Sequence, residues 1–181
     1  MRRLMLLRHA KTENAAPSGR DQDRRLDDRG HREAAEIGGW IGRHPPFPDS
    51  VLVSPAIRAH QTWEIAWAAM KDVVPQPQVE FLPELYGAGP AEMLHAIRTV
   101  TGDPRQVMLV GHNPGMHELA LALALAGSGD NRARKALADN LPTSGLAVFE
   151  FAIHDWSDVS FRHGRLVSFV SPRLLKETSG K

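Results

Sequence analysis

The chain has 181 residues, a length that fits one compact core, and we expect a single domain over residues 1–181. Lys and Arg number 22 against 21 Asp and Glu, so the formal net charge of +1 gives no overall field that would attract nucleic acid or an anionic membrane. Cysteine is absent, which excludes disulfide scaffolds, thiolate metal sites and every mechanism with a cysteine nucleophile.

The N-terminal segment predicts a short buried strand. Residues 4–7 form an apolar run that stops at Arg8 and His9, which makes the run too short for the apolar region of a signal peptide. No run of 18 apolar residues occurs elsewhere in the sequence. We therefore expect a cytoplasmic protein with no membrane contact.

Predicted strands and helices alternate along the rest of the chain. After a polar stretch at 11–25, Asp27 or Asp28 is the expected cap of a helix that reaches residue 42. Ser54 is the expected cap of a second helix that ends near residue 70. The other expected elements are strands at 51–53, 79–82 and 106–110, helices at 92–100, 116–125 and 132–138, and a terminal antiparallel pair at 146–153 and 165–170. This alternation predicts an α/β fold with a mostly parallel sheet and helices on both faces.

Four residues are predicted to meet at one edge of this sheet. His9 and His112 directly follow predicted strands, and ligands of such folds bind at the carboxyl ends of the strands. Arg8 adjoins His9, and Arg58 lies in the first turn of a predicted helix, where a guanidinium and free backbone amides are suited to bind phosphate. We therefore expect these four side chains to surround a single phosphate group.

This set of side chains predicts phosphoryl transfer to a histidine. A phosphoryl group in transit spreads negative charge over its equatorial oxygens, which Arg8, Arg58 and protonated His112 would stabilise. Neutral His9 would attack phosphorus through one ring nitrogen while the other donates to a backbone carbonyl. Water would then hydrolyse the phosphohistidine intermediate.

The same motifs resemble those of the histidine phosphatase superfamily, also called the phosphoglycerate mutase-like family, over most of the chain. Arg8-His9-Ala10 resembles the family's Arg-His-Gly motif, with Ala10 in place of the glycine. Further similar segments are 25–30, 54–62 and 110–114. The resemblance implies a phosphoglycerate mutase-like fold, His9 as the phosphorylated nucleophile, and Arg8, Arg58 and His112 as the phosphate pocket.

Glu84 stands where the family often carries an acidic proton donor, although a surface glutamate before Tyr86 is an equal alternative. As a donor it would protonate the leaving oxygen and later deprotonate water. The short chain resembles the SixA-type branch, which removes phosphate from phosphohistidine on signalling or carrier proteins. Phosphohistidine would need a proton donor at Glu84 less than a phosphorylated alcohol would. Its imidazole, already protonated at the far nitrogen, leaves as a neutral molecule, whereas an alcohol would leave as an alkoxide.

Two other functions stay open from the sequence. One is a phosphomonoesterase for a small phosphorylated metabolite, and the other is a non-catalytic phosphate-recognition module. We expect no cofactor and no metal, because His112 and His117 lack the spacing of two ligands on one helix face and no carboxylate cluster adjoins them. Trp63 and Trp67, four apart on a predicted helix, indicate core packing. No oligomeric state follows from the sequence.

Overall fold

The computed structural model describes residues 1–180, which form an α/β fold around one six-stranded sheet. The strands are β1 (Arg2–Arg8), β2 (Ser50–Val53), β3 (Gln78–Phe81), β4 (Gln106–Gly111), β5 (Leu146–Phe151) and β6 (Arg165–Val170). Their spatial order is β3-β2-β4-β1-β5-β6. The first four strands pair in parallel, whereas β5 is antiparallel to both β1 and β6. The predicted mostly parallel sheet and its terminal antiparallel pair are confirmed.

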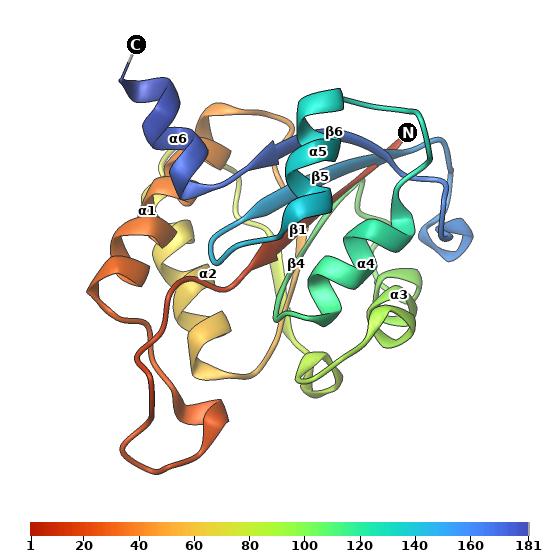
Figure 1. The fold of residues 1–181 in the computed structure, drawn as a ribbon. Helices are drawn as coiled ribbons and strands as arrows, with labels where there is room; N and C mark the ends of the chain where they lie inside the picture. Colours follow the sequence, from red (N-terminus) through yellow and green to blue (C-terminus); the bar gives the residue numbers. More distant parts are fainter. Residues whose placement is uncertain (181) are drawn as a thin grey trace.

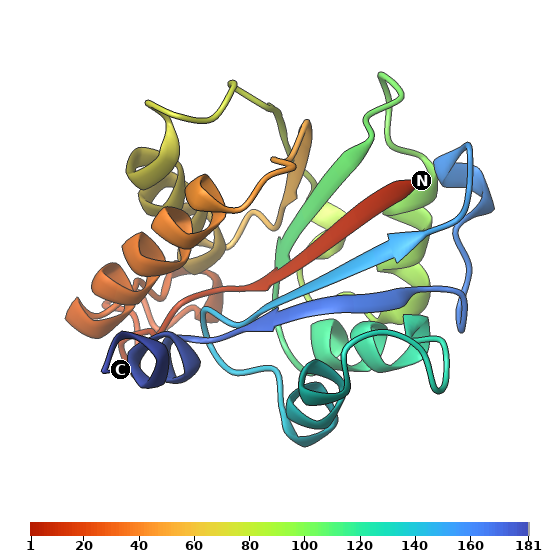
Figure 2. The same cartoon turned by 90° about the horizontal axis from the view of Figure 1, so that it is seen from above.

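Helices cover both faces of the sheet (Figures 1 and 2). In chain order they are α1 (Asp28–Arg43), α2 (Ile57–Met70), α3 (Pro90–Arg98), α4 (Gly115–Leu123), α5 (Asn131–Asp139) and α6 (Pro172–Ser179). On one face α1 contacts α2 and α6, and on the other α4 contacts α3 and α5. All of these helices except α6 were predicted from the sequence. The predicted domain boundary at residue 181 lies outside the described residues.

The strand sequences explain why both faces need a cover. Successive side chains of a strand point to opposite faces, so an unbroken apolar run must be buried on both. In β1, Leu4 and Leu6 join the cluster formed with α3, α4 and α5, while Met5 and Leu7 join the cluster formed with α1 and α2. Trp63 belongs to the second cluster and its ring stacks on that of Trp67, as predicted for packing residues.

The sequence predicted the capping residue of α1 correctly, but not that of α2. Asp27 caps α1 as expected, because its carboxylate accepts a hydrogen bond from the backbone of Gly30 at 2.7 Å. The expected Ser54 cap of α2 is wrong. Ser54 continues the pairing of β2 by donating its backbone N–H to Val110, and α2 begins only at Ile57. The Ser54 hydroxyl accepts a long hydrogen bond from the backbone N–H of Ala56, at 3.4 Å, and can also bond to a side chain.

None of the helices in residues 1–180 combines the length and the apolar character that crossing a bilayer requires.

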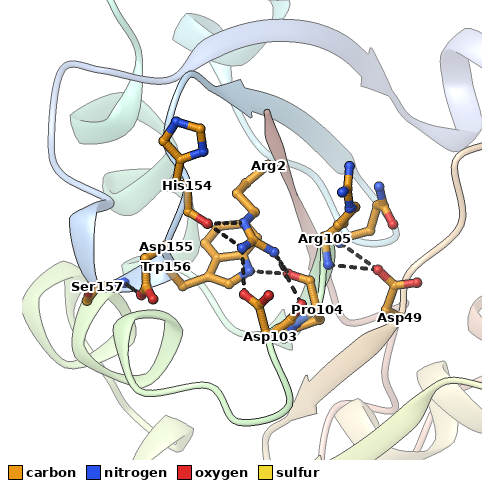
Figure 3. Close-up of polar contacts among 10 residues, drawn as sticks. Arg2, Asp49, Asp103, Pro104, Arg105, His154, Asp155, Trp156 and Ser157 are labelled. Carbon is orange, nitrogen blue, oxygen red and sulfur yellow. Dashed lines mark hydrogen bonds and ion pairs between the residues drawn. The ribbon is translucent and has the colours of Figure 1, made fainter.

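A buried arginine anchors the amino-terminal end of β1 (Figure 3). Arg2 is only 8% exposed, and its guanidinium donates to the carbonyls of His154, 2.9 Å from Nε, and Pro104, 2.8 Å from Nη1. It also forms an ion pair with Asp103. Trp156 donates its indole N–H to the same Pro104 carbonyl. One side chain thus ties β1 to the segment before β4 and to the segment after β5.

We expect Arg2→Ala to lower the free energy of unfolding by about 2 to 4 kcal/mol, because a buried side chain and the charged hydrogen bonds that it donates to the carbonyls of His154 and Pro104 are lost. Arg3→Ala is the matched control: Arg3 is partly exposed and shares Glu150 with Arg165, so its loss should cost about 0 to 1 kcal/mol. Urea unfolding of both variants measures the difference. A loss in Arg2→Ala as small as the one expected for Arg3→Ala would show that the Arg2 contacts do not stabilise the fold.

Candidate active site

Three adjacent parallel strands deliver the candidate site residues to one edge of the sheet. His9 follows β1, His112 follows β4 and Ser54 follows β2. The backbone N–H of His9 donates to the carbonyl of Gly111 at 3.0 Å, and that of Ser54 donates to the carbonyl of Val110 at 3.0 Å. Strand pairing therefore continues past the strand ends and fixes the three loops relative to one another.

The structure brings four of the predicted residues together. The ring centroids of His9 and His112 are 5.3 Å apart. The positive charges of Arg58 and Arg8 act on both imidazoles, and Arg58 stands at the start of α2 as expected. The Tyr86 ring lies edge-on to His112 at 5.7 Å and has the Arg58 guanidinium 6.0 Å from its centre. Two imidazoles and two guanidinium groups thus share one region of the molecule.

The backbone next to His9 fixes the orientation of its ring. His9 Nδ1 is 2.8 Å from the carbonyl oxygen of Ala10, a contact in which a neutral imidazole donates from Nδ1 and keeps a lone pair on Nε2. The N–H of Ala10 donates to the Thr62 hydroxyl at 2.9 Å, and Thr62 in turn donates to the carbonyl of Arg58 at 2.6 Å. This chain of hydrogen bonds couples the first motif to the second.

Alanine is compatible with the backbone at position 10, where the family motif has glycine. Ala10 does not adopt a positive φ, so no left-handed conformation penalises its methyl group. Its side chain is fully buried and packs with Leu26 and Ala34. The departure from the family motif therefore leaves the hydrogen bond between His9 and the Ala10 carbonyl in place.

Burial keeps both imidazoles neutral. Burial, and then the nearby positive charges, lower the pKa of His9 to about 3. Burial and the charge of Arg58 lower the pKa of His112 to about 4. His112 is therefore neutral at neutral pH in the protein without phosphate, and its protonation beside a bound phosphoryl group stays a prediction. Arg8, whose pKa burial and Arg58 also lower, stays protonated because an arginine does not lose its proton in proteins.

The Ser54 hydroxyl holds the ring of His112. Its Oγ is 2.6 Å from Nε2 of His112, and Ser54 is fully buried. The other ring nitrogen, Nδ1, is buried and has no hydrogen-bond partner within residues 1–180. This role of Ser54 was not predicted from the sequence, although its position directly after β2 placed it at the same edge as the two histidines.

The segment before β5 supports the site with backbone groups. The carbonyl of Leu141 accepts hydrogen bonds from Arg8 at 3.1 Å and from the Asn113 side chain at 2.9 Å. The backbone N–H of Ser144 donates to the carbonyl of His9 at 3.1 Å. These contacts carry no signal in the sequence, because any residue has the same carbonyl and nearly any residue has the same N–H.

An aspartate from the polar stretch binds the guanidinium of Arg58. Arg58 is only 6% exposed and donates from Nη1 to the backbone carbonyl of Asp21 at 2.8 Å and from Nη2 to its carboxylate at 2.9 Å. The Tyr86 hydroxyl donates to the same carboxylate oxygen at 2.6 Å. Asp21 starts a single 3-10 turn in the long loop between β1 and α1 (Figure 1), where the sequence showed no periodicity.

Glu84 is not bonded to the cluster. It lies in a 3-10 turn over Pro83–Leu85, is exposed, and forms no hydrogen bond or ion pair with the residues that the structure describes. Tyr86, two residues later, is the residue of this segment that reaches the site. A proton-donor role for Glu84 stays a prediction.

Metal ligation has no candidate site within residues 1–180, where no group of three or more His, Asp or Glu side chains is arranged to hold an ion. Nε2 of His117 lies 2.6 Å from the carbonyl oxygen of Leu137, a distance expected for an N–H donor.

Known proteins are similar to this chain in sequence and in fold. A sequence model of the histidine phosphatase superfamily (branch 1) matches residues 4–99. An uncharacterized protein of Mycobacterium tuberculosis is 37% identical over 168 residues, which span 92% of this chain and all of the relative. The chain belongs to the histidine phosphatase superfamily.

Two solved structures extend the similarity to the whole fold. A protein from Agrobacterium tumefaciens, assigned as the phosphohistidine phosphatase SixA, has a TM-score of 0.76 and 34% identity, covering 94% of this chain and 98% of that one. A protein from Nakamurella multipartitia with the same assignment has a TM-score of 0.79 and 28% identity, covering 94% and 96%. The phosphoglycerate mutase-like fold is confirmed, and the family membership supports phosphatase activity.

We expect the two buried histidines to make stability depend on pH. Their pKa values are lowered from 6.5, so the unfolded chain binds more protons than the folded chain between pH 6.5 and about 4. The free energy of unfolding should therefore fall as the pH is lowered through this window, by up to about 1.4 kcal/mol per pH unit for each histidine. Urea unfolding between pH 7 and pH 5 measures the slope. The slope should decrease in His9→Gln, and an unchanged slope would show that His9 is not held neutral by burial.

Proposed function

We propose that this protein hydrolyses phosphohistidine on a signalling or carrier protein, with His9 as the nucleophile. The observation that carries the proposal is the state of His9: its imidazole is neutral, its Nδ1 is engaged by the Ala10 carbonyl, and two guanidinium groups act on it. The similarity to proteins assigned as SixA supports the choice of substrate.

In the first step the lone pair on Nε2 of His9 attacks phosphorus. The bond between phosphorus and the substrate imidazole breaks, and its electron pair returns to that imidazole nitrogen. Arg8 and Arg58 stabilise the negative charge on the equatorial oxygens. His9 becomes positively charged as its new bond forms, and the Ala10 carbonyl, 2.8 Å from Nδ1, stabilises this charge.

The second step returns His9 to its starting state. A water oxygen bonds to phosphorus, the bond to Nε2 breaks, and the electron pair returns to the His9 ring while a water proton passes to the phosphate or the solvent. His112 gains a role once phosphate is bound, because a dianion beside its ring raises its pKa and favours the protonated form. The Ser54 hydroxyl, 2.6 Å from Nε2, keeps that ring in place through both steps.

A substrate whose leaving group is neutral imidazole suits the environment of the cluster. An alcohol leaves as an alkoxide unless an acid protonates it, whereas phosphohistidine protonated at its far nitrogen needs no such acid. Glu84 is exposed and forms no hydrogen bond or ion pair with the four site residues. This arrangement favours phosphohistidine over a small phosphorylated alcohol, which is the second candidate substrate.

We expect His9→Ala to abolish hydrolysis of an aryl phosphate without unfolding the protein, because the nucleophile is removed. His31→Ala, which changes an exposed histidine of α1, is the matched control and should keep full activity. A label trapped from radioactive substrate on the wild-type protein should be lost in acid and kept in base, as a phosphoramidate requires. An acid-stable label would reject histidine as the nucleophile, and a wild-type protein without any hydrolysis would favour the phosphate-recognition module.

The substrate class is tested with Glu84→Gln. We expect turnover of a phosphohistidine carrier protein to stay within about twofold of the wild-type value, because its leaving group needs no proton donor. Turnover of sugar phosphates should be slower than that of the carrier in the wild type. Faster turnover of the sugar phosphates, together with a loss of about 100-fold or more in Glu84→Gln, would assign the protein to small phosphomonoesters instead.

A further inference from the structure

The guanidinium of Arg58 is held at two points by a single residue. Nη1 donates to the backbone carbonyl of Asp21 at 2.8 Å, and Nη2 donates to the Asp21 carboxylate at 2.9 Å. Arg58 is only 6% exposed, so this contact lies at the inner side of the site. Two bonds to one partner fix the rotation of a planar group, and Asp21 thereby sets the direction in which the other N–H groups of Arg58 point.

Those other N–H groups are the ones that can bind phosphate. A guanidinium carries five N–H donors, and within residues 1–180 only the two bonds to Asp21 engage those of Arg58. The rigid fork matches phosphoryl oxygens in a limited range of orientations. A guanidinium that is not held would have to be oriented whenever substrate binds, which costs conformational entropy.

Asp21 is itself fixed by neighbouring side chains. The Tyr86 hydroxyl donates to Oδ2 at 2.6 Å, and Arg24 donates to Oδ1 at 3.3 Å. Arg24 also donates to the hydroxyl of Thr12 at 2.6 Å. The hydrogen bond from Tyr86, together with Arg58 and Arg24, lowers the pKa of the Asp21 carboxyl group. The carboxylate is therefore ionised at neutral pH, and its hydrogen bond with Arg58 is charge-assisted.

The loop that carries Asp21 is closed at its base and tied to the helix of Arg58. Thr12 and Leu26 form an antiparallel bridge across the base of the loop. The backbone N–H of Leu26 donates to Oε1 of Gln61 on α2 at 2.8 Å. The loop is thus placed against α2 by bonds that involve neither Asp21 nor Arg58.

We propose that Asp21 is a positioning residue, which holds Arg58 in the orientation that stabilises the equatorial oxygens of the transferred phosphoryl group. In this role Asp21 contacts Arg58 and not the substrate. The proposal rests on the proposed function for the identity of the cluster as the phosphate site. Because all phosphoryl substrates carry the same equatorial oxygens, the effect of Asp21 should not depend on the leaving group.

A double-mutant cycle tests whether Asp21 acts through Arg58. The variants are Asp21→Ala, Arg58→Ala and the double variant, measured by kcat and KM for p-nitrophenyl phosphate and phosphoramidate and by the Kd for inorganic phosphate. We expect Asp21→Ala to lower kcat/KM about tenfold on both substrates, mainly through kcat, because an oriented donor matters most in the transition state. In the Arg58→Ala background, Asp21→Ala should change kcat/KM by less than about twofold.

Two further variants separate positioning from the folding of the loop. Asp21→Asn keeps an oxygen that accepts the bond from Arg58, so its kcat/KM should stay within about threefold of the wild-type value. The matched control is Asp23→Ala in the same 3-10 turn, which removes a carboxylate that contacts Ser18 and Arg20 instead. Its activity should stay within about twofold of wild type.

Several results would overturn the proposal. An unchanged or increased activity in Asp21→Ala would show that its carboxylate is dispensable or competes with phosphate for Arg58. Losses that multiply in the double variant would show that Asp21 acts by another route, and unequal losses on the two substrates would place its effect at the leaving group. An equal loss in Asp23→Ala would show that only the folding of the loop matters.

Failure of the proposed function gives a different pattern. The wild type would then leave a phosphohistidine carrier protein intact, while the cycle is still read from the two small substrates. If the wild type hydrolyses none of them, the cycle is read from the Kd for inorganic phosphate. Weaker phosphate binding in Asp21→Ala that disappears in the Arg58→Ala background supports the proposal, and additive effects on the Kd overturn it.

Discussion

The parallel pairing of β1 with β4 is the constraint on which the site depends. Arg8 is opposite Gly111 in this pair, so the next residue of each strand, His9 and His112, emerges at the same edge. A shift of one residue would turn each side chain to the other face of the sheet. The hydrogen bond from His9 to Gly111 extends this register to the histidine itself, which allows two distant segments to form one site.

The same strand is held at both of its ends. Arg2 binds carbonyl groups of two neighbouring segments at the start of β1, and the apolar side chains between Arg2 and Arg8 are buried on both faces. A nucleophile mounted on such a strand loses little conformational freedom when substrate binds, since its position is already fixed. The stability of the fold and the placement of His9 therefore have a common origin in β1.

Burial and charge have different effects within the cluster. Burial lowers the pKa of both histidines, which leaves the imidazoles neutral and one of them able to attack phosphorus. The permanent positive charge comes from the two arginines, and Asp21 offsets part of it. Asp21 also pairs with Arg24 of the same loop, so loop residues outside the strands that carry the histidines contribute to the charge balance of the site.

The sequence by itself determined the α/β class, the alternating elements and the group Arg8, His9, Arg58 and His112, because hydrophobic periodicity and strand ends are local features of the chain. Only the tertiary structure decided the roles of Ser54 and Asp21, since each acts through a partner more than thirty residues away. It also decided that His112 is neutral, because desolvation depends on what packs around a side chain and leaves no trace in its neighbours along the sequence.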